Sequence, residues 1–249
     1  MSSSTTPATQ NGSPFKGVWP LLAPYVASPV AASAAIVPPF RYLMEKSAQQ
    51  RGLPVPRIPI LTGLKEGVKA APNVGLIIAI QLALQQKIEN ALTGDESKSS
   101  LPSKLGSSAL VGVVSIPPLA FFDGQTMGWT MRETLRRFTP KQGLAIAFQE
   151  TSFVGGQSVS DRLASAMKRQ FGDHWAIDYV AAYTAGAFGS LAGHPGNTAL
   201  TRWQNGLTVD GFRQSMLGAA RKGHAIGVFS VLYRVGNKLL NPPAQKPTV

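Results

Sequence analysis

The chain has 249 residues, no cysteine, and charged residues at only 14% of its positions. The lack of cysteine excludes disulfides, zinc–thiolate sites and thiol catalysis, and the charge content is far below the roughly 25% of an ordinary soluble domain. With 24 basic and 12 acidic residues, the formal net charge is +12, which suits nucleic acid, an anionic membrane surface or an anionic small molecule. Because the basic residues stand in short groups between long uncharged stretches, we predict a membrane protein, with no nucleic-acid polymer as partner.

Polar tails are predicted at both ends of the chain. Residues 1–16 are rich in Ser, Thr, Pro and Asn. They lack the basic start and apolar core of a secretory signal and the Arg-rich amphipathic pattern of a transit peptide. We therefore predict a disordered tail there, an internal targeting signal, and a second tail at residues 241–249.

Uncharged stretches between the tails are the candidate membrane spans. A helix needs about 20 residues to cross the hydrocarbon layer of a bilayer. Three stretches without a formal charge meet or approach this length: residues 17–40, 105–122 and 179–201. Weaker candidates alternate with them: residues 70–86, residues 143–160 (interrupted by Glu150) and residues 223–233. This alternation predicts six membrane-spanning helices.

The spacing of proline and glycine indicates an internal repeat. Each strong stretch ends near a proline, and these prolines are 79 and 77 residues apart: Pro39, Pro118 and Pro195. Each weaker stretch comes with two glycines twelve residues apart: Gly63 and Gly75, Gly143 and Gly155, and Gly211 and Gly223. We therefore predict a triplication. Its parts are repeat 1 at residues 17–92 (two transmembrane helices plus a short loop helix), a polar loop at 93–104, repeat 2 at 105–172 and repeat 3 at 173–240.

The prolines also predict the shape of the repeats. A proline inside a helix removes one backbone hydrogen bond and kinks the helix. Three kinks at equivalent positions predict an all-α membrane protein with six transmembrane helices in three pseudo-repeats around a central cavity, the odd helices being kinked at Pro. The loops after the odd helices hold 14 of the 24 Lys and Arg residues. These loops are therefore predicted on the positive side of the membrane, with both termini on the other.

The third repeat resembles the mitochondrial carrier family. That family carries the pattern Pro-x-Asp/Glu-x-x-Lys/Arg-x-Arg/Lys-x-Gln after each odd helix. Pro195, Arg202 and Gln204 agree with it, whereas Asn197 and Leu200 stand at the acidic and basic positions. The end of the sixth helix keeps the aromatic residue of a second family pattern at Tyr233.

The first two repeats depart further from the family pattern. After Pro39, the acidic position, the basic position and the position of Arg202 hold Arg41, Met44 and Lys46. After Pro118, the same three positions hold Ala120, Asp123 and Gln125. In the family these charges form a ring of salt bridges that closes one end of the cavity. Here only Arg41 with Asp123 could form such a pair. Closure would then rely on apolar packing, or the protein no longer cycles.

The resemblance also implies a substrate site midway along the even helices. Carrying the register over from Tyr233 and from Gly75, Gly155 and Gly223 selects five residues: Gln81, Gln157, Asp161, Arg162 and Phe229. An ionisable residue facing a membrane cavity is a functional candidate. Two alternatives stay open: Asp161 and Arg162 could mark the aqueous end of the fourth helix, and Gln81 could bond a neighbouring helix.

We find no Gly-rich phosphate loop, no pair of catalytic carboxylates and no Ser/His/Asp order, and we expect no enzyme, no metal and no cofactor. The resemblance implies a monomer that carries a small anionic solute across the mitochondrial inner membrane by alternating access, with membrane lipid such as cardiolipin as a second partner. In an intracellular bacterium the target would be the host mitochondrion, and the outer membrane is the less favoured location. The alternative is a non-transporting protein of the same fold that acts in membrane organisation, protein insertion or partner binding.

Overall fold

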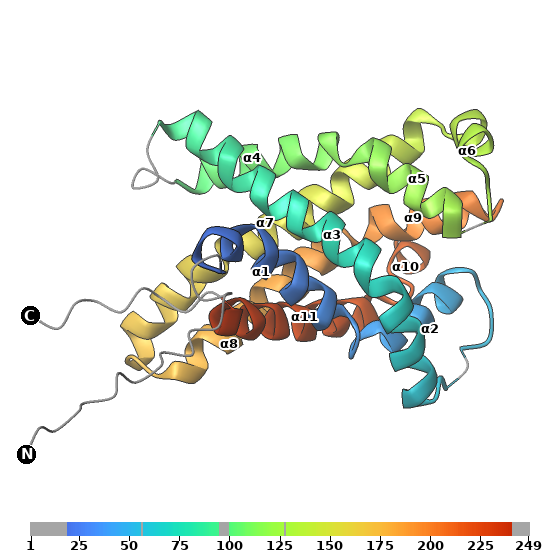
Figure 1. Ribbon diagram of the computed structural model, residues 1–249. Helices are drawn as coiled ribbons and strands as arrows, with labels where there is room; N and C mark the ends of the chain where they lie inside the picture. Colours follow the sequence, from blue (N-terminus) through green and yellow to red (C-terminus); the bar gives the residue numbers. More distant parts are fainter. Residues whose placement is uncertain (1–18, 56, 95–99, 127, 241–249) are drawn as a thin grey trace, which may run out of the picture.

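The computed structural model describes residues 19–55, 57–94, 100–126 and 128–240. Every regular element in this part of the chain is a helix (Figure 1), which confirms the predicted all-α class. Both predicted tails, at residues 1–16 and 241–249, lie outside the described residues. The polar loop expected at 93–104 is described only in part, and α4 begins within it at Leu101.

The elements follow one another in three similar units, each with a broken helix followed by a long one. The first unit consists of α1 (Trp19–Ile36), α2 (Phe40–Gln50) and α3 (Ile60–Thr93). The second consists of α4 (Leu101–Val114), α5 (Ile116–Thr126), α6 (Met131–Arg137) and α7 (Pro140–Phe171). The third consists of α8 (Trp175–Ala192), α9 (His194–Gln204), α10 (Phe212–Ser215) and α11 (Ala219–Leu240). The short loop helix expected in the first unit is absent from residues 51–55 and 57–59.

The three breaks coincide with the predicted prolines. They fall at residues 37–39, at Ser115 and at Gly193, and the break between α4 and α5 bends the chain by 46°. Pro39 is the N-cap of α2, and Pro118 and Pro195 lie in the first turns of α5 and α9. Proline is tolerated there because the first turn of a helix does not need its N–H group. The prolines therefore begin the second helical segment rather than interrupt the first.

Six long segments pack side by side in a closed ring. Each of α1, α3, α4, α7, α8 and α11 contacts the next in this order, and α11 contacts α1. The broken continuations α2, α5 and α9 gather at one end, together with α6 and α10, at the right of Figure 1. We call this the bend end. The opposite end, where α1 begins and α11 ends, is the terminal end.

Capping residues fix where several helices begin and end. Thr139 and Gln142 form a capping box at the start of α7, and Thr130 and Glu133 form another at the start of α6. The backbone amide and hydroxyl of Thr130 bond the Glu133 carboxylate and lower its pKa. Gly94 ends α3 in the left-handed conformation, with φ of 69°. Local capping thus makes α3 and α7 much longer than their uncharged stretches predicted.

Length and apolar character single out few of these helices as membrane spans. Within the described residues, Ile60–Thr93 is long and apolar enough to cross a membrane, and Leu101–Val114 with Ile116–Gly124 would be a second span if the bent pair counts as one. The six-span topology therefore stays a prediction.

The paired glycines of the predicted triplication do not take equivalent places in the three units. Gly63 and Gly143 lie inside α3 and α7, but Gly211 precedes α10 with φ of 88°. The second glycines also lie at unequal depths in the ring. Gly75 packs against Ser33, about one turn before its break; Gly155 packs near Ser108, about two turns before; Gly223 packs against Leu191, almost at the break. Each of these three glycines instead lies at a contact between its own helix and a neighbouring helix, at a depth that differs from unit to unit.

Another close backbone approach joins α7 and α8. A Cβ atom on Gly156 would lie 2.7 Å from the carbonyl oxygen of Ala185 and 2.8 Å from Cα of Gly189. Small residues let two helices approach in this way, and the approach is what packs membrane helices where lipid gives no hydrophobic drive.

We predict that Gly156→Leu lowers the free energy of unfolding by about 1–3 kcal/mol, because the added side chain overpacks this contact. Thermal unfolding of the purified protein in detergent measures the loss. Gly106→Leu is the matched control, because a Cβ atom on Gly106 of α4 would meet nothing nearer than Leu92 at 4.0 Å. Equal losses from the two variants would contradict the close α7–α8 contact.

Candidate functional site

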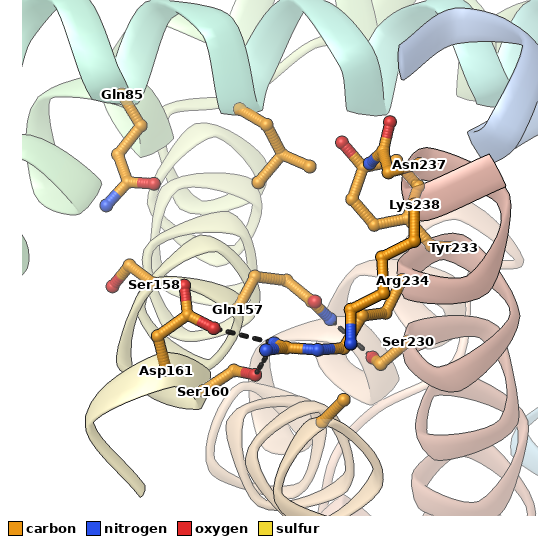
Figure 2. A pocket seen from close by; sticks show the side chains of 12 residues that line it. Gln85, Gln157, Ser158, Ser160, Asp161, Ser230, Tyr233, Arg234, Asn237 and Lys238 are labelled. Atoms are coloured by element: carbon orange, nitrogen blue, oxygen red, sulfur yellow. Dashed lines mark hydrogen bonds and ion pairs between the residues drawn. The ribbon is translucent and has the colours of Figure 1, made fainter. Parts of the chain in front are cut away.

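Two cavities lie one above the other inside the ring. The first, of about 440 Å³, is lined by side chains of α3, α7, α8 and α11 toward the terminal end (Figure 2). We call it the terminal cavity. The second, of about 310 Å³, lies toward the bend end and is lined by residues of α1 to α3, α5, α7, α8, α9 and α11. We call it the inner chamber.

A layer of aromatic rings separates the two cavities. Phe153 lines the inner chamber and Tyr233 lines the terminal cavity. Phe229, which is fully buried, lies between them, with its ring centroid 6.3 Å from that of Phe153 and 5.8 Å from that of Tyr233. Tyr233 is held by a 2.7 Å hydrogen bond to Ser28 of α1. The layer blocks a continuous path along the axis of the ring.

Charged side chains from α7 and α11 line the terminal cavity. Figure 2 shows the Arg234 guanidinium reaching the Asp161 carboxylate at 2.6 Å and the Ser160 hydroxyl at 3.3 Å. Arg234 also lies 3.4 Å from Asp178 of α8. Beside it, Gln157 donates to Ser230 at 2.6 Å, which ties α7 to α11. These contacts hold the three helices together around a polar, water-accessible space.

The inner chamber encloses charged groups of both signs. The Glu150 carboxylate accepts a hydrogen bond from Gln81 at 2.8 Å and another from Gln149 at 2.7 Å. Gln81 also donates to Ser115 at 3.0 Å. Glu150 is 6% exposed and Lys222 is 7% exposed, and each interacts electrostatically with the other. Burying charges is costly unless they are paired and hydrogen-bonded. The two buried charges therefore make the inner chamber a candidate functional site.

The bend end is closed by a hydrogen-bond network of amide and hydroxyl groups that also includes the Lys46 ammonium. Asn197 of α9 accepts from Lys46 at 2.8 Å and from Gln50 at 3.0 Å, and it donates to Gln149 at 2.6 Å. Gln50, which is fully buried, also donates to Thr198 at 2.8 Å. These bonds join α2, α7 and α9, so helices of all three units meet at this end. An amide has taken the central position that the resemblance assigns to a charged residue.

The predicted substrate residues divide between different surfaces. Gln81 lines the inner chamber, Gln157 and Asp161 line the terminal cavity, and Phe229 belongs to the aromatic layer between them. They do not form one site because they were aligned on glycines that lie at different depths. Gln81 does bond neighbouring helices, as the second reading of this residue expected.

Arg162 is not part of the central site. It lines an outer groove between α4, α7 and α8, together with apolar residues such as Leu105 and Phe188. Asp161 and Arg162 are adjacent on α7, and consecutive helical positions point in different directions. Of the two, only Asp161 lines the terminal cavity. Arg162 therefore does not join the other predicted substrate residues.

The predicted gate residues gather at the bend end, but their pairing differs from the expectation. Asp123 bonds Gln204 and lies within electrostatic range of Lys46. Arg41 donates to Tyr42 at 2.7 Å and packs against Gly63, so the expected Arg41–Asp123 ion pair is not formed among the described residues. The expected pair is missing because the orientation of α2 turns Lys46, rather than Arg41, toward the axis of the ring.

Arg202 also has a different role from a gate charge. It is 9% exposed and donates to the backbone carbonyl oxygens of Gln50, at 3.0 Å, and Thr208. It therefore braces α9 against α2 and against the loop that follows α9. This bond satisfies a carbonyl at the C-terminal end of α2, which the helix itself leaves without a partner.

Several residues of the two cavities were not predicted. Glu150 was noted only as an interruption of a span, and Lys222, Gln149 and Arg234 were not selected. The available signal was that Glu150 and Lys222 are charges next to long apolar runs, which in a membrane protein favours a position facing the interior. Among the described residues, no group of three His, Asp or Glu side chains is placed to hold a metal ion.

Comparison with known proteins gives no further assignment. No protein-family model matches the chain, and no curated protein or solved structure matches it either.

We predict that Gln50→Leu destabilises the protein by about 1–3 kcal/mol, because it removes the two hydrogen bonds that the buried Gln50 side chain donates to Asn197 and Thr198. Unfolding in detergent, followed by intrinsic fluorescence, measures the change. Arg51→Ala on the same helix is the control, since the Arg51 side chain is exposed and exposed substitutions change stability by about 0.5 kcal/mol or less. A Gln50 variant as stable as this control would show that the bend-end network does not stabilise the fold.

Proposed function

We propose that the protein is a solute carrier that moves a small solute with an anionic group across a membrane by alternating access. The observation that carries the proposal is the pair of axial cavities, one toward each end of a closed helical ring. Each cavity has buried or half-buried charges in its wall, and one thin aromatic layer lies between them. A purely structural membrane protein has no need for charged groups in such positions.

The layout suits a binding site that opens to one side at a time. In the conformation described, the aromatic layer separates the inner chamber from the terminal cavity, and the Asn197 network lies between the chamber and the bend end. Alternating access requires two closed states of similar free energy. Neutral hydrogen bonds contribute about 0.5–1.5 kcal/mol each, and a bond to a charged group such as Lys46 contributes about 1.5–3 kcal/mol. A closure built mainly from neutral bonds can be opened at modest cost.

The mitochondrial inner membrane is the location that we propose, on the strength of the resemblance in the third repeat. Pro195, Arg202 and Gln204 carry that resemblance. Anionic headgroups such as cardiolipin are proposed as the lipid partner, because the loops at the bend end are rich in Lys and Arg.

A non-transporting role in membrane organisation or partner binding is the second candidate. One observation favours it: Asn197 and Leu200 replace the charges that would form a salt-bridge gate in the third unit, and Leu200 is packed into an apolar cluster with Ala145 and Ile146. A gate that is packed and hydrogen-bonded in this way resembles a permanent structural joint.

Reconstitution into liposomes distinguishes the two candidates. We predict that the purified protein exchanges or takes up at least one radiolabelled solute from a panel of nucleotides, keto acids, dicarboxylates and amino acids. Phe229→Trp, which overpacks the aromatic layer, should reduce the rate at least about tenfold, because a strain of about 1–3 kcal/mol in one closed state removes the balance between the two states that the cycle needs.

The control for this experiment is Phe188→Trp, because Phe188 of α8 is 68% exposed on the outside of the ring. Its transport should equal that of the unaltered protein. Folded protein that moves none of the panel solutes would contradict the carrier proposal and leave the non-transporting role.

A further inference from the structure

Lys222 is the unusual residue of the inner chamber. It lies on α11, is 7% exposed and lines the chamber wall. Among the described residues, its ammonium group has no hydrogen-bond or ion-pair partner, although the charges of Glu150 and Lys46 act on it. A buried ammonium without bonded acceptors is costly. A ligand that brings an acceptor to it would therefore be bound favourably.

Ser190 of α8 stands at the same level as Lys222. Gly223, the residue after Lys222, packs against Leu191, the residue after Ser190. Both side chains line the chamber, and the Ser190 hydroxyl has no hydrogen-bond partner among the described residues. A hydroxyl and an ammonium on adjacent helices make a pair of donors suited to a carboxylate.

Acceptors dominate another part of the wall, formed by α3, α5 and α7. Glu150 carries a carboxylate there, and the side-chain oxygen of the adjacent Gln81 has no hydrogen-bond partner in the part of the chain that the structure describes. Asp123 adds a second carboxylate to the wall. This part of the chamber therefore attracts a group that donates hydrogen bonds and carries positive charge.

Most of the remaining wall is apolar. The chamber is bounded largely by aliphatic and aromatic side chains, among them Ile36, Phe40, Leu119, Phe122 and Phe153. A mainly apolar cavity of about 310 Å³ with a few polar groups at fixed positions is typical of a small-molecule site. The apolar walls select against a ligand that is polar over its whole length.

We propose that the inner chamber binds an α-amino acid with an apolar side chain, its carboxylate on Lys222 and its ammonium toward Glu150. This proposal rests on the carrier function and names the solute class of that carrier. The two cations of the wall, Lys46 and Lys222, are balanced by Asp123 and Glu150. A zwitterion matches this balance, whereas a dicarboxylate or a nucleotide would place further negative charge beside two carboxylates.

Three compounds with the same apolar body test the recognition of both charges. They are leucine, the keto acid 4-methyl-2-oxopentanoate, which lacks the ammonium, and 3-methylbutylamine, which lacks the carboxylate. A ligand that binds the folded state raises its stability. We expect leucine to raise the unfolding temperature of the full-length protein in detergent, and the other two compounds to require concentrations at least about tenfold higher for the same shift.

Two substitutions test the assigned groups. Lys222→Met should weaken leucine binding at least about tenfold, because the charged contact to the carboxylate is lost. Glu150→Gln should weaken leucine binding while leaving or improving that of the keto acid, an exchange of preference that mere destabilisation would not produce. Lys69→Met is the matched control, because Lys69 lies on the exposed face of α3 in an ion pair with Glu66. It should bind leucine as the unaltered protein does.

The outcomes separate this proposal from the carrier function. Leucine stabilisation that depends on Lys222 and Glu150 supports the site, and accompanying leucine uptake into liposomes supports the carrier as well. Stabilisation without uptake supports the site and contradicts the carrier. Equal or stronger stabilisation by the keto acid or the amine overturns the amino-acid site. A lack of stabilisation by leucine overturns it as well. In either case, uptake of another solute would still support the carrier function.

Discussion

The contact between the first and the last helix is the constraint on which the whole arrangement depends. A side chain on Gly236 of α11 would meet Cβ of Ala31 of α1 at 2.9 Å, and Ser28 bonds Tyr233 between the same helices. These contacts turn a row of helices into a ring. Without them the ring would be open between α1 and α11, and the cavities would be grooves open along that side. The small residues of both helices are therefore as important to the site as its charges.

Inside the ring, polar groups are distributed so that each closure has a different character. The terminal cavity is bordered by ion pairs such as Arg234–Asp161, which are partly exposed to water and so contribute about 0–1 kcal/mol each. The bend end relies on amide and hydroxyl groups around Asn197, and the layer between the cavities relies on stacked rings. Within the ranges that the structure describes, none of these closures is held by a deeply buried salt bridge, which would cost several kcal/mol to break. Such a balance is compatible with a cycle between conformations.

The sequence predicted the elements well and the site poorly, for identifiable physical reasons. The breaks near Pro118 and Pro195 follow from local backbone chemistry, because a proline affects the hydrogen bonds and backbone angles of the residues next to it in the sequence. The inner chamber depends instead on how α3, α7 and α11 are rotated, because Gln81 meets Glu150 only if both face the axis. Glycine spacing gave no such information, since each glycine marks a close contact of its own helix pair. The same limit applied to Arg41, whose direction is set by the packing of α2 and not by its place in a motif.

Closure of the ring can be measured directly because the chain contains no cysteine. In the Ala31→Cys/Gly236→Cys protein, mild oxidation in the membrane should form a disulfide after a small shift of the two helices, and fragments cut by protease between α1 and α11 should stay linked until reduced. Gly112→Cys/Thr151→Cys on the neighbouring helices α4 and α7 is the positive control, and Ala31→Cys/Phe188→Cys, whose second position faces outward on α8, is the negative control. The account predicts that the first two pairs link and the third does not. Linking of the α4–α7 pair without the α1–α11 pair would contradict the closed ring, and with it both cavities.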